Sequence, residues 1–112
     1  MISGINELIE VARDGFLVNL PECPSVPEIL GARSVSGDSL LHVASARGRT
    51  DEVEMLLDLG ISINEQGDYG YTPLHYAAES QSRKVYDLLI KRGCDPLVRN
   101  AYGDLAKDLF LL

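Results

Sequence analysis

The chain has 112 residues, of which 46% are hydrophobic and 24% charged, and its formal net charge is −7 at pH 7. This length supports one domain and excludes a two-domain enzyme with a large cleft. The acidic balance disfavours direct binding to nucleic acid or to an anionic membrane, and no apolar run approaches the roughly 18 residues of a membrane span. We therefore expect a protein partner, and a basic one.

The first 36 residues predict an irregular N-terminal unit. A helix is expected over 3–14 from apolar residues at helical spacing, which are Ile5, Leu8, Ile9 and Ala12. Three prolines disfavour a regular helix over 16–27, and a short helical turn is expected around Val26–Leu30. The opening residues lack the basic n-region of a secretory signal, so we expect a cytoplasmic protein.

Two units with the same local code follow, over 37–69 and 70–102. A shift of 33 residues aligns Gly37 with Gly70 and Gly103, His42 with His75, Gly48 with Gln81, and Gly60 with Gly93. Thr72-Pro73 predicts a helix start, because a proline in the first turn needs no N–H donor. Gly48 is expected to end the inner helix of its unit in a left-handed turn. With Gln81 in that place, the turn of the next unit is either rebuilt or strained by roughly 1 kcal/mol.

The second helix of each unit is predicted from a stripe of apolar residues. The expected stripe positions are Val53, Leu56 and Leu57 in the first unit and Tyr86, Leu89 and Ile90 in the second. Three acids of the first of these helices, Asp51, Glu52 and Glu54, are interpreted as a solvated face.

The second unit carries a recognisable motif. Gly70-Tyr71-Thr72-Pro73-Leu74-His75-Tyr76-Ala77-Ala78 resembles the G-x-T-P-L-H-x-A-A pattern of ankyrin repeats, and the resemblance covers 34–112. It implies an all-α fold: an ankyrin-repeat solenoid of stacked helix-turn-helix units with hairpin-like loops. In that arrangement 1–36 is a degenerate N-terminal capping repeat, 37–69 and 70–102 are repeats, and 103–112 is a truncated C-terminal cap.

No residue pattern supports catalysis or metal binding. His42 and His75 recur in one local context, which favours a structural role, and the resemblance implies that each imidazole bonds loop backbone and a Thr hydroxyl. Cys23 and Cys94 lie far apart in the sequence and are expected to be free thiols, so a four-ligand zinc site is not predicted. Phosphate-binding and nucleophile motifs are missing too, and we predict a non-enzymatic protein without cofactor or metal.

The resemblance also implies a partner-binding face, made of loop tips and the exposed side of the inner helices. The corresponding residues are Asp38, Arg47, Asp68, Tyr69, Tyr71, Tyr76, Glu79, Tyr102 and Asp104. Tyrosines often dominate the binding energy of an interface, and neighbouring acids attract a basic partner. For Tyr69, Tyr71 and Tyr102 the alternative interpretation is packing of loop on loop.

The sequence thus predicts a protein–protein interaction module that is a monomer when free. The specific hypothesis is an inhibitor or immunity-type protein that blocks a basic partner, such as a toxin or nuclease. A general adaptor or scaffold is the alternative. A structural homo-oligomer that associates through the apolar end Leu109–Leu112 is a third hypothesis.

Overall fold

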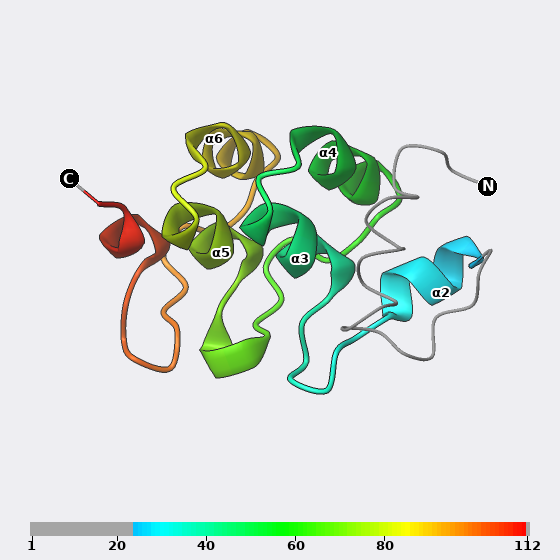
Figure 1. Cartoon of the computed structure of the whole chain (residues 1–112), viewed down its shortest axis with the longest axis horizontal. Coiled ribbons are helices and arrows are strands. Elements are labelled where there is room, and N and C mark those ends of the chain that lie inside the picture. The colour runs from blue at the N-terminus through cyan, green and yellow to red at the C-terminus, as the bar shows by residue number, and fades with distance from the viewer. Residues whose placement is uncertain (1–23, 112) are drawn as a thin grey trace.

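In the computed structural model of the protein, residues 24–111 are described, and their helices form two layers (Figure 1). The inner layer holds α3 (Leu40–Ala46), α5 (Pro73–Glu79) and the 3-10 helix η3 (Ala106–Leu109), and the outer layer holds α4 (Thr50–Asp58) and α6 (Arg83–Lys91). Each layer stacks in chain order, since α3 contacts α5, α5 contacts η3, and α4 contacts α6. The stack of helix-turn-helix units confirms the predicted fold class.

Two short elements complete the described chain. The helical turn expected around Val26–Leu30 is confirmed as α2 (Val26–Gly31), and η2 (Asp68–Gly70) is a 3-10 turn in the loop before α5. Ser25 caps α2, because its Oγ accepts from the backbone N–H of Glu28 and its own backbone N–H donates to the carboxylate of Glu28 at 3.0 Å. Ile29 of α2 is buried in the core. The helix expected over 3–14, the segment 16–23 and Cys23 lie outside the described residues.

The inner helices begin in the same way, as their shared motif predicts. The hydroxyls of Ser39 and Thr72 accept from the N–H groups of His42 and His75, at 3.4 and 3.2 Å. Each histidine Nδ1 in turn accepts from the backbone N–H of its cap residue, at 3.0 and 3.1 Å. Pro73 follows Thr72 at the first turn of α5, as predicted. Because these bonds span three residues, the local sequence encodes both helix starts.

The far nitrogen of each imidazole joins one unit to the next loop. His42 Nε2 lies 2.9 Å from the carbonyl oxygen of Glu65 and 3.0 Å from that of Tyr71, and His75 Nε2 lies 2.8 Å from that of Asp104. Since Nδ1 is an acceptor, the ring proton resides on Nε2 and is donated to these carbonyls. Burial lowers the pKa of His42 and so favours its neutral form. His75 has the expected contacts with loop backbone and with a Thr hydroxyl, whose oxygen lies 2.7 Å from Nδ1. His42 has the same arrangement with Ser39 in place of Thr, at 2.8 Å.

The register of α6 differs from the sequence prediction. Leu89 is fully buried as expected, but Ile90 is 39% exposed, and Val85 is buried instead. Residues four apart lie on one face of a helix, so Val85 and Leu89 both point inward and Ile90 turns outward. Tyr86, the third predicted stripe residue, is half-buried beside this core.

The same register explains a second correction, on α4. Glu52, one unit before Val85, is buried at 1% exposure, and its carboxylate lies 2.9 Å from the guanidinium of Arg49. The prediction that Glu52 belongs to a solvated face is therefore wrong, because its position turns toward the interior. Asp51 and Glu54 are exposed, as that interpretation expected.

Gln81 occupies a strained turn between α5 and α6. Its φ of 61° matches the 68° of Gly48, which makes the equivalent turn in the preceding unit. The left-handed conformation costs a residue with a Cβ about 1 kcal/mol, so of the two alternatives the turn is strained and not rebuilt. The Gln81 side chain also holds the segment after η3: its Nε2 donates to the carbonyl of Leu109 at 3.1 Å, and its Oε1 accepts from the N–H of Leu111 at 2.9 Å.

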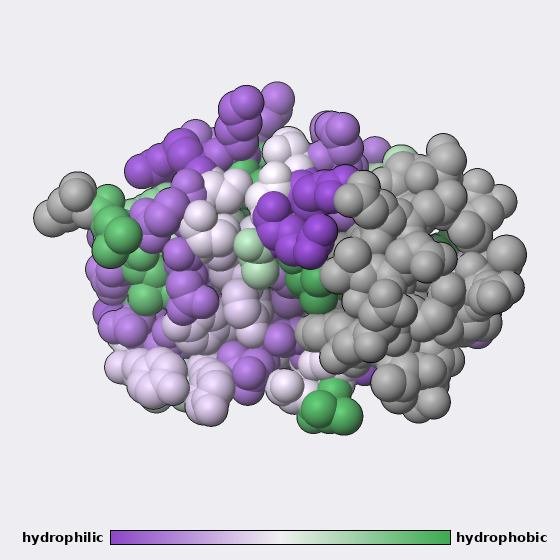
Figure 2. All heavy atoms as spheres, viewed as in Figure 1, coloured by the Kyte–Doolittle hydropathy of each residue, from purple (hydrophilic) through white to green (hydrophobic). Residues whose placement is uncertain are grey.

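The surface of the protein is mostly hydrophilic. Hydrophilic side chains cover the outer helices in Figure 2, and an apolar patch marks the C-terminal end. Leu109 and Phe110 pack partly against the core, while Leu111 is 81% exposed. Within 24–111, no helix combines the length and the apolar character needed to cross a membrane.

Candidate functional site

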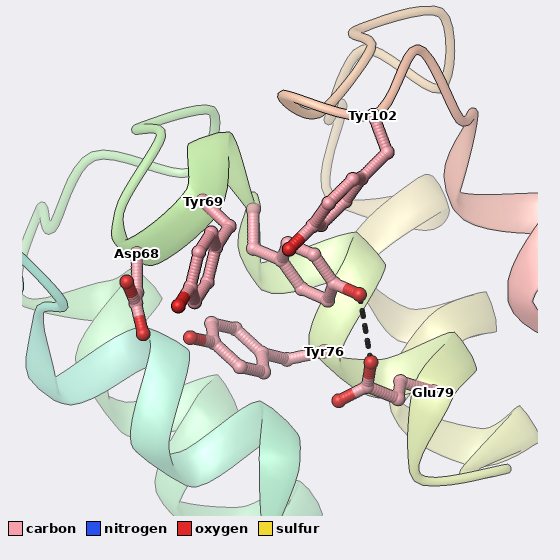
Figure 3. Close-up of a pocket in the computed structure, with 6 residues that line it drawn as sticks. Asp68, Tyr69, Tyr76, Glu79 and Tyr102 are labelled. Carbon is pink, nitrogen blue, oxygen red and sulfur yellow. Dashed lines mark hydrogen bonds between the residues drawn. The ribbon is translucent and has the colours of Figure 1, made fainter.

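Tyrosines and acids converge on one hollow at the tips of the loops and the exposed side of α5. The hollow has a volume of about 290 Å³, and its lining residues are Asp68, Tyr69, Tyr71, Tyr76, Glu79 and Tyr102 (Figure 3). All six belong to the partner-binding face expected from the sequence. The fold thus gathers, from one helix and two loops, side chains that lie up to 34 positions apart in the chain.

The two loops that supply Tyr69 and Tyr102 are joined by backbone contacts. Ala101 N–H donates to the carbonyl of Tyr69 at 2.8 Å. Gly70 permits this approach, because a Cβ there would lie 2.9 Å from Ala101 N, and its φ of +71° also favours glycine. Gln66 adds a bridge, since its Nε2 donates to the carbonyls of Gly70 and Arg99 at 3.0 and 2.9 Å.

Tyr69 and Tyr102 form a stacked pair at the rim of the hollow. Their ring centroids lie 5.8 Å apart with an interplanar angle of 27°. The two residues nevertheless remain 62% and 65% exposed. Tyr69 also has a φ of 53°, a conformation that is uncommon for residues other than glycine. Packing of loop on loop therefore coexists with an accessible aromatic surface.

Tyr71 and Tyr76 form the inner part of the hollow, with ring centroids 5.1 Å apart. Tyr71 donates its hydroxyl proton to Glu79 Oε2 at 2.7 Å, the bond marked by the dashed line in Figure 3. Burial, helped by this carboxylate, raises the pKa of Tyr71 to about 12. The hydroxyl of Tyr76 donates to Asp38 Oδ2 at 2.8 Å, and burial raises its pKa as well. Both rings are thus fixed by hydrogen bonds before any partner arrives.

Asp38 does not line the hollow but forms hydrogen bonds with two residues that do. The residue is 8% exposed, and its second carboxylate oxygen accepts from the backbone N–H of Asp68 at 2.8 Å. Its two oxygens therefore position one tyrosine and one acid of the hollow. Arg47, at the C-terminal cap of α3, and Asp104, whose carbonyl accepts from His75, are also outside the lining.

The hollow is negatively charged. Among the described residues that line it none is basic, and Asp68 and Glu79 supply two carboxylates. Within 24–111 the hydrogen bonds of Asp68 use its backbone N–H and carbonyl, which leaves its carboxylate available to a donor. Fixed rings and open acceptors suit a positively charged group better than a neutral or anionic one.

The described residues offer little support for metal binding or for thiol chemistry. In the part of the chain that the structure describes, no three His, Cys, Asp or Glu residues are grouped as metal ligands would be. Cys94 is a free, buried thiol, and burial raises its pKa to about 11, which keeps it protonated and weakly nucleophilic at neutral pH.

Comparison with known proteins identifies the fold family. A model of ankyrin repeats in three copies matches residues 8–100. The chain belongs to the ankyrin-repeat family. The family assignment confirms the resemblance that the 70–78 motif indicated. Ankyrin repeats are protein–protein interaction modules, and the family is generally not catalytic.

Individual ankyrin relatives are much longer than the segment they share with this chain. Protein phosphatase 1 regulatory subunit 12A of Mus musculus is 35% identical over 74 residues, which are 66% of this chain and 7% of that protein. The ADP-ribosylation factor GTPase-activating protein AGD4 of Arabidopsis thaliana is 35% identical over 82 residues, 72% of this chain and 11% of its own length. The ankyrin repeat domain-containing protein M-T5 of Myxoma virus is 42% identical over 52 residues, covering 46% of this chain and 11% of the viral protein.

Proposed function

We propose that this ankyrin-repeat chain binds a basic segment of a partner protein in the hollow lined by the four tyrosines, Asp68 and Glu79. The observation that carries the proposal is the convergence of exposed aromatic rings and two carboxylates in one hollow without a lining cation. The net charge of −7 favours the same class of partner at longer range.

The rigidity of the hollow supports a binding role. Ordering flexible side chains on association costs about 0.5–1.5 kcal/mol each. The stacked pair Tyr69–Tyr102 and the hydrogen-bonded hydroxyls of Tyr71 and Tyr76 have much of that order already. Tyrosine adds a large contact area with few rotatable bonds, so the face is suited to hold a partner tightly.

Binding of this kind supports two biological roles. In the inhibitor or immunity-type role, the chain covers a basic surface that a toxin or nuclease needs for its own substrate. In the adaptor role, it links its partner to another protein. The names of two relatives, a phosphatase regulatory subunit and a GTPase-activating protein, favour a regulatory or adaptor setting for ankyrin segments of this type.

The experiment compares capture by the tagged full chain and by two variants. We expect Tyr71→Ala combined with Tyr102→Ala to lose the partner that the wild type retains. The matched control reverses two exposed acids on α4, Asp51→Lys with Glu54→Lys, and should retain it. The proposal is wrong if the control loses the partner while the tyrosine variant keeps it, since the interface would then lie on the outer layer.

Kinetics with the captured partner test the assigned roles. Tyr71→Ala should raise the dissociation rate about tenfold, for a loss of about 1.4 kcal/mol at a buried interface position. Asp68→Lys should slow association and weaken its dependence on salt, because exposed charges act at a distance and are screened beyond about 10 Å at 0.1 M salt. One basic partner whose activity stops on binding indicates an inhibitor, and several partners with unchanged activity indicate an adaptor.

A further inference from the structure

The hollow offers aromatic faces and carboxylates in an arrangement that discriminates between cations. Its tyrosines form two pairs, Tyr69 with Tyr102 at the rim and Tyr71 with Tyr76 inside. Asp68 and Glu79 lie on opposite sides of these rings in Figure 3, the first in η2 and the second on α5. A group that enters the hollow therefore meets tyrosine rings and lies close to carboxylate acceptors.

The carboxylates of Asp68 and Glu79 can still accept further hydrogen bonds. Asp68 receives no donor at its carboxylate from the described residues, and Glu79 accepts only the hydroxyl of Tyr71 there, through one of its two oxygens. Asp38 is not such an acceptor, because its two oxygens are used internally. An occupant that suits the hollow therefore donates hydrogen bonds and carries positive charge.

The guanidinium of arginine meets both requirements. It is planar, so one face can stack on a tyrosine ring while N–H groups at its edge donate to a carboxylate of the hollow. A lysine ammonium is a compact and strongly hydrated charge that cannot stack in this way, and a trimethylated ammonium has no N–H to donate. The volume of about 290 Å³ is also at the low end of the roughly 300–1,000 Å³ of small-molecule pockets, which suits a single side chain.

We propose that the hollow is an arginine-binding subsite, occupied by one arginine side chain of the partner protein. This inference rests on the proposed function and names the group on the partner that the face recognises. The tyrosine rings and the carboxylates set the preference for guanidinium over ammonium, and Asp38 holds Tyr76 and the backbone of Asp68 in place.

The test uses a capped peptide as the probe. Acetyl-Gly-Arg-Gly-amide is titrated into the full chain labelled with ¹⁵N, and amide shifts are followed by NMR. We expect saturable shifts over 66–71, 76–80 and 100–104, with a dissociation constant of roughly millimolar order for one side chain. The citrulline peptide, which has nearly the same shape without the charge, should bind at least about tenfold more weakly than the arginine peptide. The lysine peptide should bind at least about threefold more weakly.

Variants that preserve shape assign the effect to the two carboxylates. Asp68→Asn and Glu79→Gln remove one charge each, and in the second variant the new amide oxygen can still accept from the Tyr71 hydroxyl. Each should weaken binding of the arginine peptide about three- to tenfold, because each removes one negative charge near the guanidinium. The control Asp51→Asn removes an equal charge on α4 and should leave the dissociation constant unchanged.

Several results would overturn the inference. Equal binding of the citrulline or the lysine peptide would show that the hollow does not select guanidinium, and saturable shifts confined to the outer helices would place the arginine elsewhere. No binding of the arginine peptide, with partner capture still sensitive to Tyr71 and Tyr102, would reject the arginine subsite and leave the proposed function standing. Binding of the peptide together with partner capture that ignores these tyrosines would reject the proposed function instead.

Discussion

Replacing Gln81 tests whether a strained residue is kept for the bonds that its side chain makes. The turn between α5 and α6 needs a φ of 61°, which costs a residue with a Cβ about 1 kcal/mol relative to glycine. Against this cost stand the two hydrogen bonds that join Gln81 to Leu109 and Leu111, at 3.1 and 2.9 Å, beside a longer one from its Nε2 to the carbonyl of Glu79 at 3.3 Å. At about 0.5–1 kcal/mol for each exposed bond, they contribute about 1–2 kcal/mol.

Two substitutions separate these contributions. Gln81→Ala keeps the strain and removes both bonds, so we expect a loss of about 1–2 kcal/mol in the free energy of unfolding. Gln81→Gly removes the bonds and also relieves the strain, so its loss should be no more than about 1 kcal/mol. The difference between the variants reports the strain, and the difference between wild type and Gln81→Ala reports the bonds.

Urea denaturation followed by circular dichroism measures both differences in the free energy of unfolding. Hydrogen exchange of the Leu111 amide tests the hydrogen bond independently. That amide donates to Gln81 in the wild type and should exchange faster in both variants. The reasoning is refuted if Gln81→Gly is more stable than the wild type by about 1 kcal/mol, because strain would then be present without a compensating bond. Equal stability of Gln81→Ala and wild type, with unchanged exchange at Leu111, refutes it as well.

Three further predictions concern the histidines and the joined loops. His75→Ala should destabilise the protein by about 1–3 kcal/mol in urea denaturation, because it leaves buried partners unbonded, and an unchanged midpoint would contradict its structural role. Burial lowers the pKa of His42 in the folded state, so the unfolded chain takes up the proton more readily. The free energy of unfolding should therefore be level above about pH 6.5 and fall as the pH drops below it. His42→Gln should lessen that slope between about pH 7 and pH 5, and an equal slope would contradict the role given to His42. Gly70→Ala should weaken binding of the capped arginine peptide by several-fold and lower the melting temperature, since its Cβ would lie 2.9 Å from Ala101 N and separate the two loops; unchanged shifts in 100–104 on peptide titration would contradict this.

The local sequence determined the helix starts and the repeat register. Thr72 and His75 lie three residues apart, and the hydrogen bonds between them form within a single turn. The recurrence of glycines and of His42 as His75 at a spacing of 33 residues predicted two equivalent units. The left-handed turn at Gly48 was likewise predictable, because the conformational need is met by one residue.

Tertiary structure alone decided which polar side chains become buried or hydrogen-bonded between the stacked units. Asp38 looked like a partner-binding acid, yet stacking brings it against Asp68, 30 positions away, and Tyr76, 38 positions away, and its carboxylate is used inside the protein. Glu52 and Val85 share one inward-facing position, although only the second is apolar. The physical reason is that a local motif fixes its own turn, whereas the burial and bonding of a side chain depend on the distant residues that neighbouring repeats bring beside it.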